Sequence, residues 1–188
     1  SKHVDHAKND EQSIKERQLD PHFHALVFDK IYGTVAYVPD LGMDVIRQFW
    51  YNKEKGTLVA AGTLPSGPGT CSPHGPRYME FHHTLPIAYV INELSSIVTV
   101  FRVDQKALRD VAKGGGSVKR PTLVQIQSTS TLPAAFPRSL NTCGRITVHP
   151  SGWFVVVSNR GHDSLSVFRV TKEGVEAGTL ASVTFTHT

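Results

Sequence analysis

Three segments of the 188-residue sequence align with one another without a gap, and this internal repeat restricts the fold more than any other feature. The segments are 36–49, 88–101 and 155–168, so the repeat recurs at spacings of 52 (36 to 88) and 67 (88 to 155) residues. Each one contains the end of an apolar stretch, a polar turn and the next apolar stretch. Repeats of this length built from antiparallel strands are typical of β-propeller blades. A β-sandwich is disfavoured, because the gapless match includes the turn residues.

Short apolar and β-branched stretches follow one another along the chain, separated by Gly, Pro, Asn or Asp. There are twelve, in three groups of four, which predicts an all-β propeller with three four-stranded blades over about 21–66, 74–132 and 143–188. Residues 1–20 are polar and carry no wide apolar face, so we expect a loop or extension there, with at most a helical turn or two around NDEQSIKERQ. The Gly-rich stretch 112–120 lacks the residue order of a phosphate-binding P-loop, and we predict a flexible hairpin loop.

Composition excludes several classes of protein. A hydrophobic fraction of 39% with 19% charged residues is that of a soluble globular domain. The net charge is +4, but the Lys and Arg residues are scattered, so we expect no nucleic-acid partner. Cys71 and Cys143 form neither a disulfide framework nor a zinc motif, which favours a cytoplasmic location. No apolar run has transmembrane length and none resembles a signal peptide, so we expect no membrane partner; since the chain starts at Ser1, the natural N-terminus is expected to lie upstream.

The carboxylate of Glu93 interrupts the apolar stretch IAYVINELSSIVTVFRV, and the repeat shows where in a blade this residue lies. Aligned on the repeat, Glu93 is equivalent to Leu41 and Arg160, at the end of the second strand of each blade. The first strands align on Phe28, Phe81 and Val148. This alignment makes His24, Arg77 and Gly144 equivalent, at the start of the first strand.

Antiparallel neighbours place the start of the first strand beside the end of the second, and the first strand of a blade lines the propeller channel. His24, Arg77, Glu93 and Arg160 are therefore predicted to gather at one mouth of that channel. Guanidinium groups bind carboxylate or phosphate, and a His or Glu transfers protons, so the set suits an active site for an anion. A purely structural pairing of Arg160 with Glu93 between blades is the alternative reading.

Three longer strings carry a resemblance to a known family. They are YVPDLGMDVI, GPRYMEFHHTLPIAYVINELSSIVTVF and VHPSGWFVVVSNRGHDSLSVFRV, in this order. Together they resemble the lactonase family of seven-bladed β-propellers, which includes bacterial-type 6-phosphogluconolactonases and carboxy-cis,cis-muconate lactonizing enzymes. The preceding ERQLDPHFH resembles the loop and paired histidines that come before this region in the family, and the likeness runs from about Ile14 to the C-terminus.

The resemblance implies a metal-independent hydrolase or cycloisomerase without a cofactor. Its substrate would be an anionic lactone such as 6-phosphogluconolactone, of the pentose phosphate pathway, and its catalytic residues would be His24, Arg77, Glu93 and Arg160. Hydrolase and cycloisomerase stay open as alternatives. The alternative from a different functional class is a non-catalytic propeller scaffold. A scaffold has no need for these four polar residues together.

Neighbouring polar residues complete the predicted site. We expect substrate binding from His22, His74, Asn92 and His162. The H-x-H pair of His22 and His24 has the spacing of metal ligands on a strand, but no third ligand stands nearby, so no metal is expected. For His74, shaping its loop is an equal alternative, and Asp163 is expected to cap its turn.

The extent of the repeat sets a further expectation. Family members close seven blades, whereas three are predicted here. We therefore expect a fragment of a longer protein, or a chain completed by a second chain or by self-association, because an open arc leaves sheet faces bare.

Overall fold

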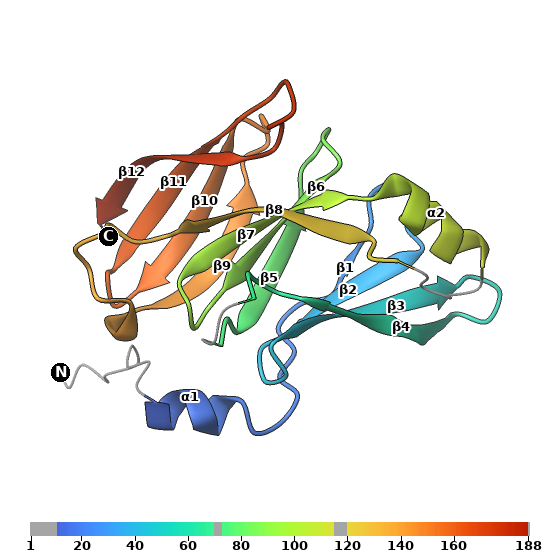
Figure 1. The fold of residues 1–188 in the computed structure, drawn as a ribbon, viewed down its shortest axis with the longest axis horizontal. Coiled ribbons are helices and arrows are strands. Elements are labelled where there is room, and N and C mark those ends of the chain that lie inside the picture. Colours follow the sequence, from blue (N-terminus) through green and yellow to red (C-terminus); the bar gives the residue numbers. More distant parts are fainter. Residues whose placement is uncertain (1–10, 70–72, 115–119, 188) are drawn as a thin grey trace.

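The computed structural model describes residues 11–69, 73–114 and 120–187 and consists of three four-stranded antiparallel sheets that lie side by side (Figure 1). The first sheet contains β1 (Val27–Phe28), β2 (Val35–Asp40), β3 (Val45–Asn52) and β4 (Thr57–Pro65). The second contains β5 (Pro76–Phe81), β6 (Ile87–Asn92), β7 (Ile97–Val103) and β8 (Leu123–Ser130). The third contains β9 (Thr142–Val148), β10 (Phe154–Arg160), β11 (Ser164–Val170) and β12 (Leu180–His187). Each sheet keeps its strands in chain order, which confirms the predicted all-β arrangement of three four-stranded blades.

The register of the strands repeats from sheet to sheet. The first strand pairs with the second through Phe28–Ala36, Phe81–Ala88 and Val148–Val155. The second pairs with the third through Ala36–Phe49, Ala88–Phe101 and Val155–Phe168. The third strand pairs with the fourth with one register shift in every sheet. The shift lies just before the Phe of the third strand, which is Phe49, Phe101 or Phe168. The gapless sequence alignment therefore corresponds to one blade geometry, bulge included.

Two apolar cores lie between the sheets, and the second sheet contributes to both. Ala88 and Val90 of β6 belong to the core shared with the first sheet. Tyr89 and Ile91 belong to the core shared with the third. Side chains alternate across a strand, so a strand buried on both faces has apolar residues at every position. This explains the continuous apolar run that precedes Glu93. The first strand of the second sheet, β5, contacts β9 of the third sheet and β2 of the first.

A helix replaces part of the predicted glycine-rich hairpin loop. Helix α2 (Gln105–Lys113) connects β7 to β8, and only residues 115–119 of the stretch lie outside the described residues. The side chain of Asp104 caps the helix by accepting the backbone N–H of Ala107. Leu108 and Val111 are buried in the core between the first two sheets. The prediction of a loop over 112–120 was therefore wrong for its first residues.

A second helix, α1 (Glu11–Arg17), precedes the first sheet, where a loop or extension was predicted. No residue of α1 is buried. A 3-10 turn (Arg138–Leu140) leads into β9. Of the helices in the described ranges, none has the length and apolar character needed to cross a membrane.

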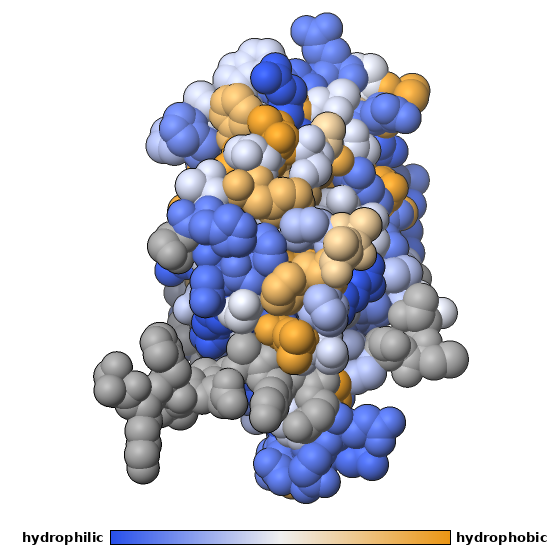
Figure 2. All heavy atoms as spheres, turned by 90° about the vertical axis from the view of Figure 1, so that its left-hand side faces the viewer, coloured by the Kyte–Doolittle hydropathy of each residue, from blue (hydrophilic) through white to orange (hydrophobic). Residues whose placement is uncertain are grey.

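The outer face of the third sheet carries uncovered apolar side chains. Figure 2 views the molecule from this side and shows a broken band of hydrophobic residues between hydrophilic ones. Leu165 of β11 and Val183 of β12 are 37% and 50% exposed, and Trp153 before β10 is 49% exposed. The opposite face of this sheet forms a core with the second sheet, so among the described residues only one of its two faces is covered.

Candidate active site

Glu93 follows the last residue of β6, and its side chain, only 2% exposed, is the centre of the candidate site. Its backbone N–H donates to the carbonyl of Gly75 at 2.7 Å, and its carbonyl accepts the N–H of Cys143 at 3.2 Å. Gly75 has φ 63°, and a Cβ there would lie 2.5 Å from Leu94 Cγ, so a glycine lets this loop close on the turn. The backbone of Glu93 is thus fixed between the loop before β5 and the first residues of β9.

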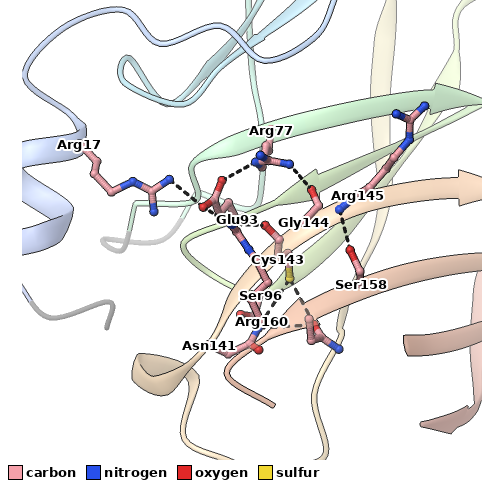
Figure 3. Close-up of polar contacts among 11 residues, drawn as sticks. Arg17, Arg77, Glu93, Ser96, Asn141, Cys143, Gly144, Arg145, Ser158 and Arg160 are labelled. Atoms are coloured by element: carbon pink, nitrogen blue, oxygen red, sulfur yellow. Dashed lines mark hydrogen bonds and ion pairs between the residues drawn. The ribbon is translucent and has the colours of Figure 1, made fainter. Parts of the chain in front are cut away.

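Three guanidinium groups converge on this carboxylate (Figure 3). Nη2 of Arg17 lies 2.7 Å from Oε1, and Nη2 of Arg160 lies 2.5 Å from the same oxygen. Nε of Arg77 lies 2.8 Å from Oε2, an ion pair without the alignment of a hydrogen bond. The three come from the end of α1, the end of β10 and the start of β5. Because a buried carboxylate is costly unless it is paired, these arginines make the burial of Glu93 tolerable.

Arg77 and Arg160 are also bound to the backbone of the third sheet. Nη1 of Arg77 donates to the carbonyl of Gly144 at 2.8 Å, and Nη2 of Arg160 donates to that of Cys143 at 3.0 Å. The guanidinium carbon of Arg77 also lies 5.0 Å from the ring centroid of Tyr78. Both guanidinium groups are thereby oriented before any ligand arrives.

Part of each guanidinium remains open. Within the described part of the chain, no acceptor pairs with Nη2 of Arg77, with Nε and Nη1 of Arg160, or with Nε and Nη1 of Arg17. The side chains of Arg17, Arg77 and Arg160 are 29%, 21% and 45% exposed. Three guanidinium groups and one carboxylate leave two positive charges in excess. The cluster therefore has both the donors and the charge to bind an anion.

The turn after Glu93 has the same conformation in all three sheets. Asp44, Ser96 and Asp163 occupy the same place in the repeat and have φ values of 56°, 53° and 49°. This left-handed conformation is uncommon outside glycine, and Asp adopts it more readily than most residues. Oδ1 of Asp163 accepts the N–H of Gly161 at 3.0 Å, which confirms the expected capping of this turn. A shared turn is what brings Glu93 and Arg160 to the same rim.

His22 and His24 lie in the extended stretch between α1 and β1. Phe23 forms an isolated bridge to Asp40, and the N–H of His22 donates to Oδ1 of Asp40 at 2.9 Å. The two histidine rings are 4.5 Å apart between centroids. In the described ranges, no three His, Cys, Asp or Glu side chains come together as a metal site requires.

His24 is electrostatically part of the arginine cluster. Burial, followed by the positive charge of Arg77, lowers the pKa of His24 to about 4. His22 and Arg17 lower this pKa further, and Glu93 opposes them. The ring is thus neutral at pH 7. Its Nε2 is buried and makes no hydrogen bond to the part of the chain that the structure describes, so its hydrogen-bonding capacity is unused there.

Asn92 points into the interface between blades instead of toward the arginines. It is fully buried, and its Nδ2 donates to the carbonyl of Ser66 at 3.2 Å and to Oγ1 of Thr99 at 2.9 Å. Asn159, at the same place in the repeat, donates to the carbonyl of Thr131 at 3.0 Å. Ser66 and Thr131 each follow the last strand of the preceding sheet. The two amides therefore join each blade to the one before it.

The other two expected binding residues also have local partners. His74 is buried, with Nδ1 3.2 Å from Oγ of Ser95 and Nε2 2.9 Å from the carbonyl of Pro68, so it shapes the loop before β5. The Nδ1 of His162 lies 2.6 Å from Oγ of Ser164, and its ring packs against Phe136 at 4.7 Å. The structure thus brings Arg77, Glu93 and Arg160 into contact, with His24 coupled to them electrostatically and His22 beside His24, whereas Asn92 and His74 are buried in their own interfaces.

Arg17 is the site residue that sequence reasoning missed. It lies in the stretch read as a loop or extension, outside the repeat that located the other arginines. The string ERQLDPHFH, which resembles the family's loop before the paired histidines, contained the signal. In the structure this string connects α1 to the histidines and brings an arginine to Glu93.

Comparisons with known proteins identify the family of this fold. The family described as lactonase, 7-bladed β-propeller matches residues 1–188. The 6-phosphogluconolactonase of Bacillus subtilis (strain 168) is 34% identical over 155 residues, which is 82% of this chain and 38% of that protein. The 6-phosphogluconolactonase of Pectobacterium atrosepticum is 34% identical over 146 residues, or 76% of this chain and 38% of that protein.

A solved structure gives the same result. The periplasmic gluconolactonase of Pseudomonas aeruginosa superposes with a TM-score of 0.73 at 28% sequence identity, covering 97% of this chain and 44% of that one. The chain thus spans 38% of the length of each of the two sequence relatives. The resemblance read from the sequence is confirmed: the chain belongs to the lactonase family of seven-bladed β-propellers.

Proposed function

We propose that the complete protein hydrolyses the lactone of a sugar acid, with 6-phosphogluconolactone as the favoured substrate. One observation carries the proposal. His24 is neutral and has an unpartnered buried Nε2, and it is electrostatically coupled to Arg77 and to Glu93, the carboxylate that holds three arginines. Such a group supplies a base, oriented cations and excess positive charge, which are the requirements for attack of water on an anionic ester.

In the proposed reaction, His24 takes a proton from water as the water oxygen attacks the lactone carbonyl carbon. The carbonyl oxygen then carries a negative charge, which a guanidinium of Arg77 or Arg160 stabilises. When the carbonyl re-forms, the bond from the carbonyl carbon to the ring oxygen breaks, and the proton held by His24 goes to that oxygen. The product is the open hydroxy acid, so one water is consumed per lactone.

Glu93 has a different role in this scheme. Both of its carboxylate oxygens face guanidinium groups, and its side chain is almost fully buried. Because guanidinium groups already occupy both oxygens, neither is oriented toward a water molecule or a substrate. We therefore assign the proton transfer to His24 and treat Glu93 as the positioning residue that holds the arginines.

The relatives support the reaction class more than the exact substrate. Two are named 6-phosphogluconolactonase and one is named a gluconolactonase, so the phosphate on the substrate and the pentose phosphate pathway are parts of our proposal. The cytoplasmic location expected from the cysteine usage also stays a prediction, and the Pseudomonas relative is described as periplasmic.

The test is hydrolysis of 6-phosphogluconolactone and of glucono-δ-lactone by the complete protein, followed by base uptake at constant pH. We expect wild-type activity, and a fall in kcat of roughly 10²- to 10³-fold in His24→Gln, which removes a general base. The matched control is His83→Gln. His83 is an exposed histidine that follows β5, at the end of that strand away from Glu93.

The outcomes separate the alternatives. An unchanged kcat in His24→Gln would overturn the assignment of the base. Activity of the wild-type protein on a carboxymuconate, with none on lactones, would favour the cycloisomerase. No activity on either would favour the non-catalytic scaffold.

A further inference from the structure

Arg17 reaches the site from outside the propeller sheets. It is the last residue of α1, and its Nη2 lies 2.7 Å from the carboxylate oxygen of Glu93 that also binds Arg160. Helix α1 contributes no buried residue to the core, and the next side-chain contact along the chain is from Gln18 Nε2 to the carbonyl of Leu41 at 3.1 Å. The polar contacts of Arg17 and Gln18 therefore help to hold this segment beside the site.

Glu93 has enough counter-charge without Arg17. Arg77 and Arg160 already pair with the two carboxylate oxygens, and both are fixed by carbonyl groups of the third sheet. With these two arginines alone, the cluster has one positive charge in excess. Arg17 raises the excess to two. It also leaves Nε and Nη1 without an acceptor among the described residues, on a side chain that is 29% exposed.

The charge of the ligand follows from this count. A carboxylate or a developing oxyanion carries one negative charge, which the two fixed arginines can match. A phosphate monoester carries close to two negative charges at neutral pH and offers several acceptor oxygens. A third guanidinium with open donors is the kind of group that such a ligand recruits.

We propose that Arg17 is a specificity-determining residue that binds the doubly charged group of the substrate, so that phosphorylated lactones are preferred over unphosphorylated ones. This inference rests on the proposed function for its substrate, but it concerns a residue that the proposed reaction does not use. If Arg17 only fastened α1 to the sheets, its loss would affect both kinds of substrate alike.

The experiment compares two substrates in the complete protein. The ratio of kcat/KM for 6-phosphogluconolactone to kcat/KM for glucono-δ-lactone is measured in wild type, Arg17→Gln and Arg17→Lys. We expect the ratio to fall by roughly ten- to a hundredfold in Arg17→Gln, which removes a charge-assisted hydrogen bond. In Arg17→Lys the ratio should fall less, because the charge stays and the planar fork is lost.

Lys15→Gln is the matched control. Lys15 is exposed on the same helix, so its substitution removes one positive charge near the site without touching Glu93, and the ratio should stay at the wild-type value. An unchanged ratio in Arg17→Gln, or an equal fall in Arg17→Gln and Lys15→Gln, would overturn the proposal. Circular dichroism verifies that each variant is folded, and Arg17→Lys provides the comparison if the glutamine variant is not.

A binding measurement keeps the test independent of turnover. Titration calorimetry with 6-phosphogluconate and with gluconate is carried out on wild type and Arg17→Gln. A selective loss of 6-phosphogluconate affinity supports the inference even if the wild-type protein hydrolyses no lactone, which would overturn the proposed function alone. Equal affinity changes for both acids, or a wild-type protein that binds neither acid, would overturn the inference.

Discussion

Glu93 and Arg160 occupy the same place in two copies of the repeat, 67 residues apart, and their side chains form an ion pair of 2.5 Å. The first copy has the buried Leu41 there. This position therefore holds Leu41 in the first blade, Glu93 in the second and Arg160 in the third. Because the blades are neighbours, the two charged copies meet across the interface between the second and third sheets and form the centre of the site.

Glu93→Gln should impair the site more than the fold. The amide keeps the shape but leaves three guanidinium groups without a counter-charge, so the arginines lose their common anchor. We expect kcat/KM for 6-phosphogluconolactone to fall about a hundredfold. The free energy of unfolding should fall by about 2 kcal/mol, less than for a fully buried ion pair, because the arginines are partly exposed. Steady-state kinetics and urea unfolding of the complete protein measure the two effects.

Glu80→Gln is the control for this prediction. Oε2 of Glu80, on the same strand as Arg77, accepts the backbone N–H of Val148 at 3.1 Å and so also links the second sheet to the third. It has no arginine partner within the described residues. Equal losses of kcat/KM in the two glutamine variants would contradict a special role for Glu93.

The pH dependence of hydrolysis should report His24. Only the neutral ring accepts a proton, so activity is lost as pH falls through the pKa of His24, which burial and Arg77 lower to about 4. We expect kcat/KM to be level from pH 7 down to pH 5 and to fall tenfold per pH unit below about pH 4. Arg17→Gln removes one neighbouring positive charge and should shift the fall to higher pH. A midpoint near the ordinary histidine value of 6.5 in wild type would contradict the assignment.

The repeat made most of the blade geometry predictable. Aligning Phe28, Phe81 and Val148 fixed which residue faces which in the first hairpin of every blade, and the observed register agrees. Arg77 and Glu93 could be located at one rim for the same reason. Their positions follow from the alternation and pairing of strands, which the sequence pattern carries directly.

Features outside the repeat were not predictable in this way. Helix α2 lies in an insertion of the second blade. The sequence contains its capping residue Asp104 and its apolar Leu108 and Val111, but the twelve strands alone already complete the blade pattern, so the pattern does not call for a helix. Arg17 contacts Glu93 through a segment that has no equivalent in the other blades. Asn92 and Glu93 are adjacent at the end of a strand, and their side chains point to different sides. The structure shows that Asn92 lies in the interface between blades and that Glu93 lies at the rim with the arginines.

The bare face of the third sheet predicts self-association of residues 1–188 when they are produced alone. Leu165 and Val183 are exposed on this face, and such apolar surface is normally covered. We expect sedimentation faster than that of a 20.7 kDa monomer, and Val183→Glu should reduce it by placing a charge on the face. A compact monomer at micromolar concentration would count against this expectation.

Asn92→Ala separates the two roles considered for this residue. Its Nδ2 is the donor to the carbonyl of Ser66 and to Thr99, both in buried surroundings, so truncation leaves these acceptors unpaired. We expect the free energy of unfolding to fall by about 2 kcal/mol, with an unchanged KM for 6-phosphogluconolactone in the protein that remains folded. Urea unfolding with a constant slope measures the first effect, since a change in slope would indicate a change in the compactness of one state.

The comparison for Asn92→Ala is Asn52→Ala, at the last residue of β3, whose side chain caps the exposed turn that follows. The side chain of Asn52 accepts the backbone N–H groups of Glu54 and Lys55 at 3.0 and 3.1 Å, in contact with water, so the free energy of unfolding should change by about 0.5 kcal/mol or less. A large difference between the two variants, with KM constant in both, identifies Asn92 as the residue that joins the first two blades. The reverse result, a tenfold higher KM in Asn92→Ala with unaltered unfolding, would instead establish it as a substrate-binding residue, because a contact made only with the substrate leaves the free protein unchanged.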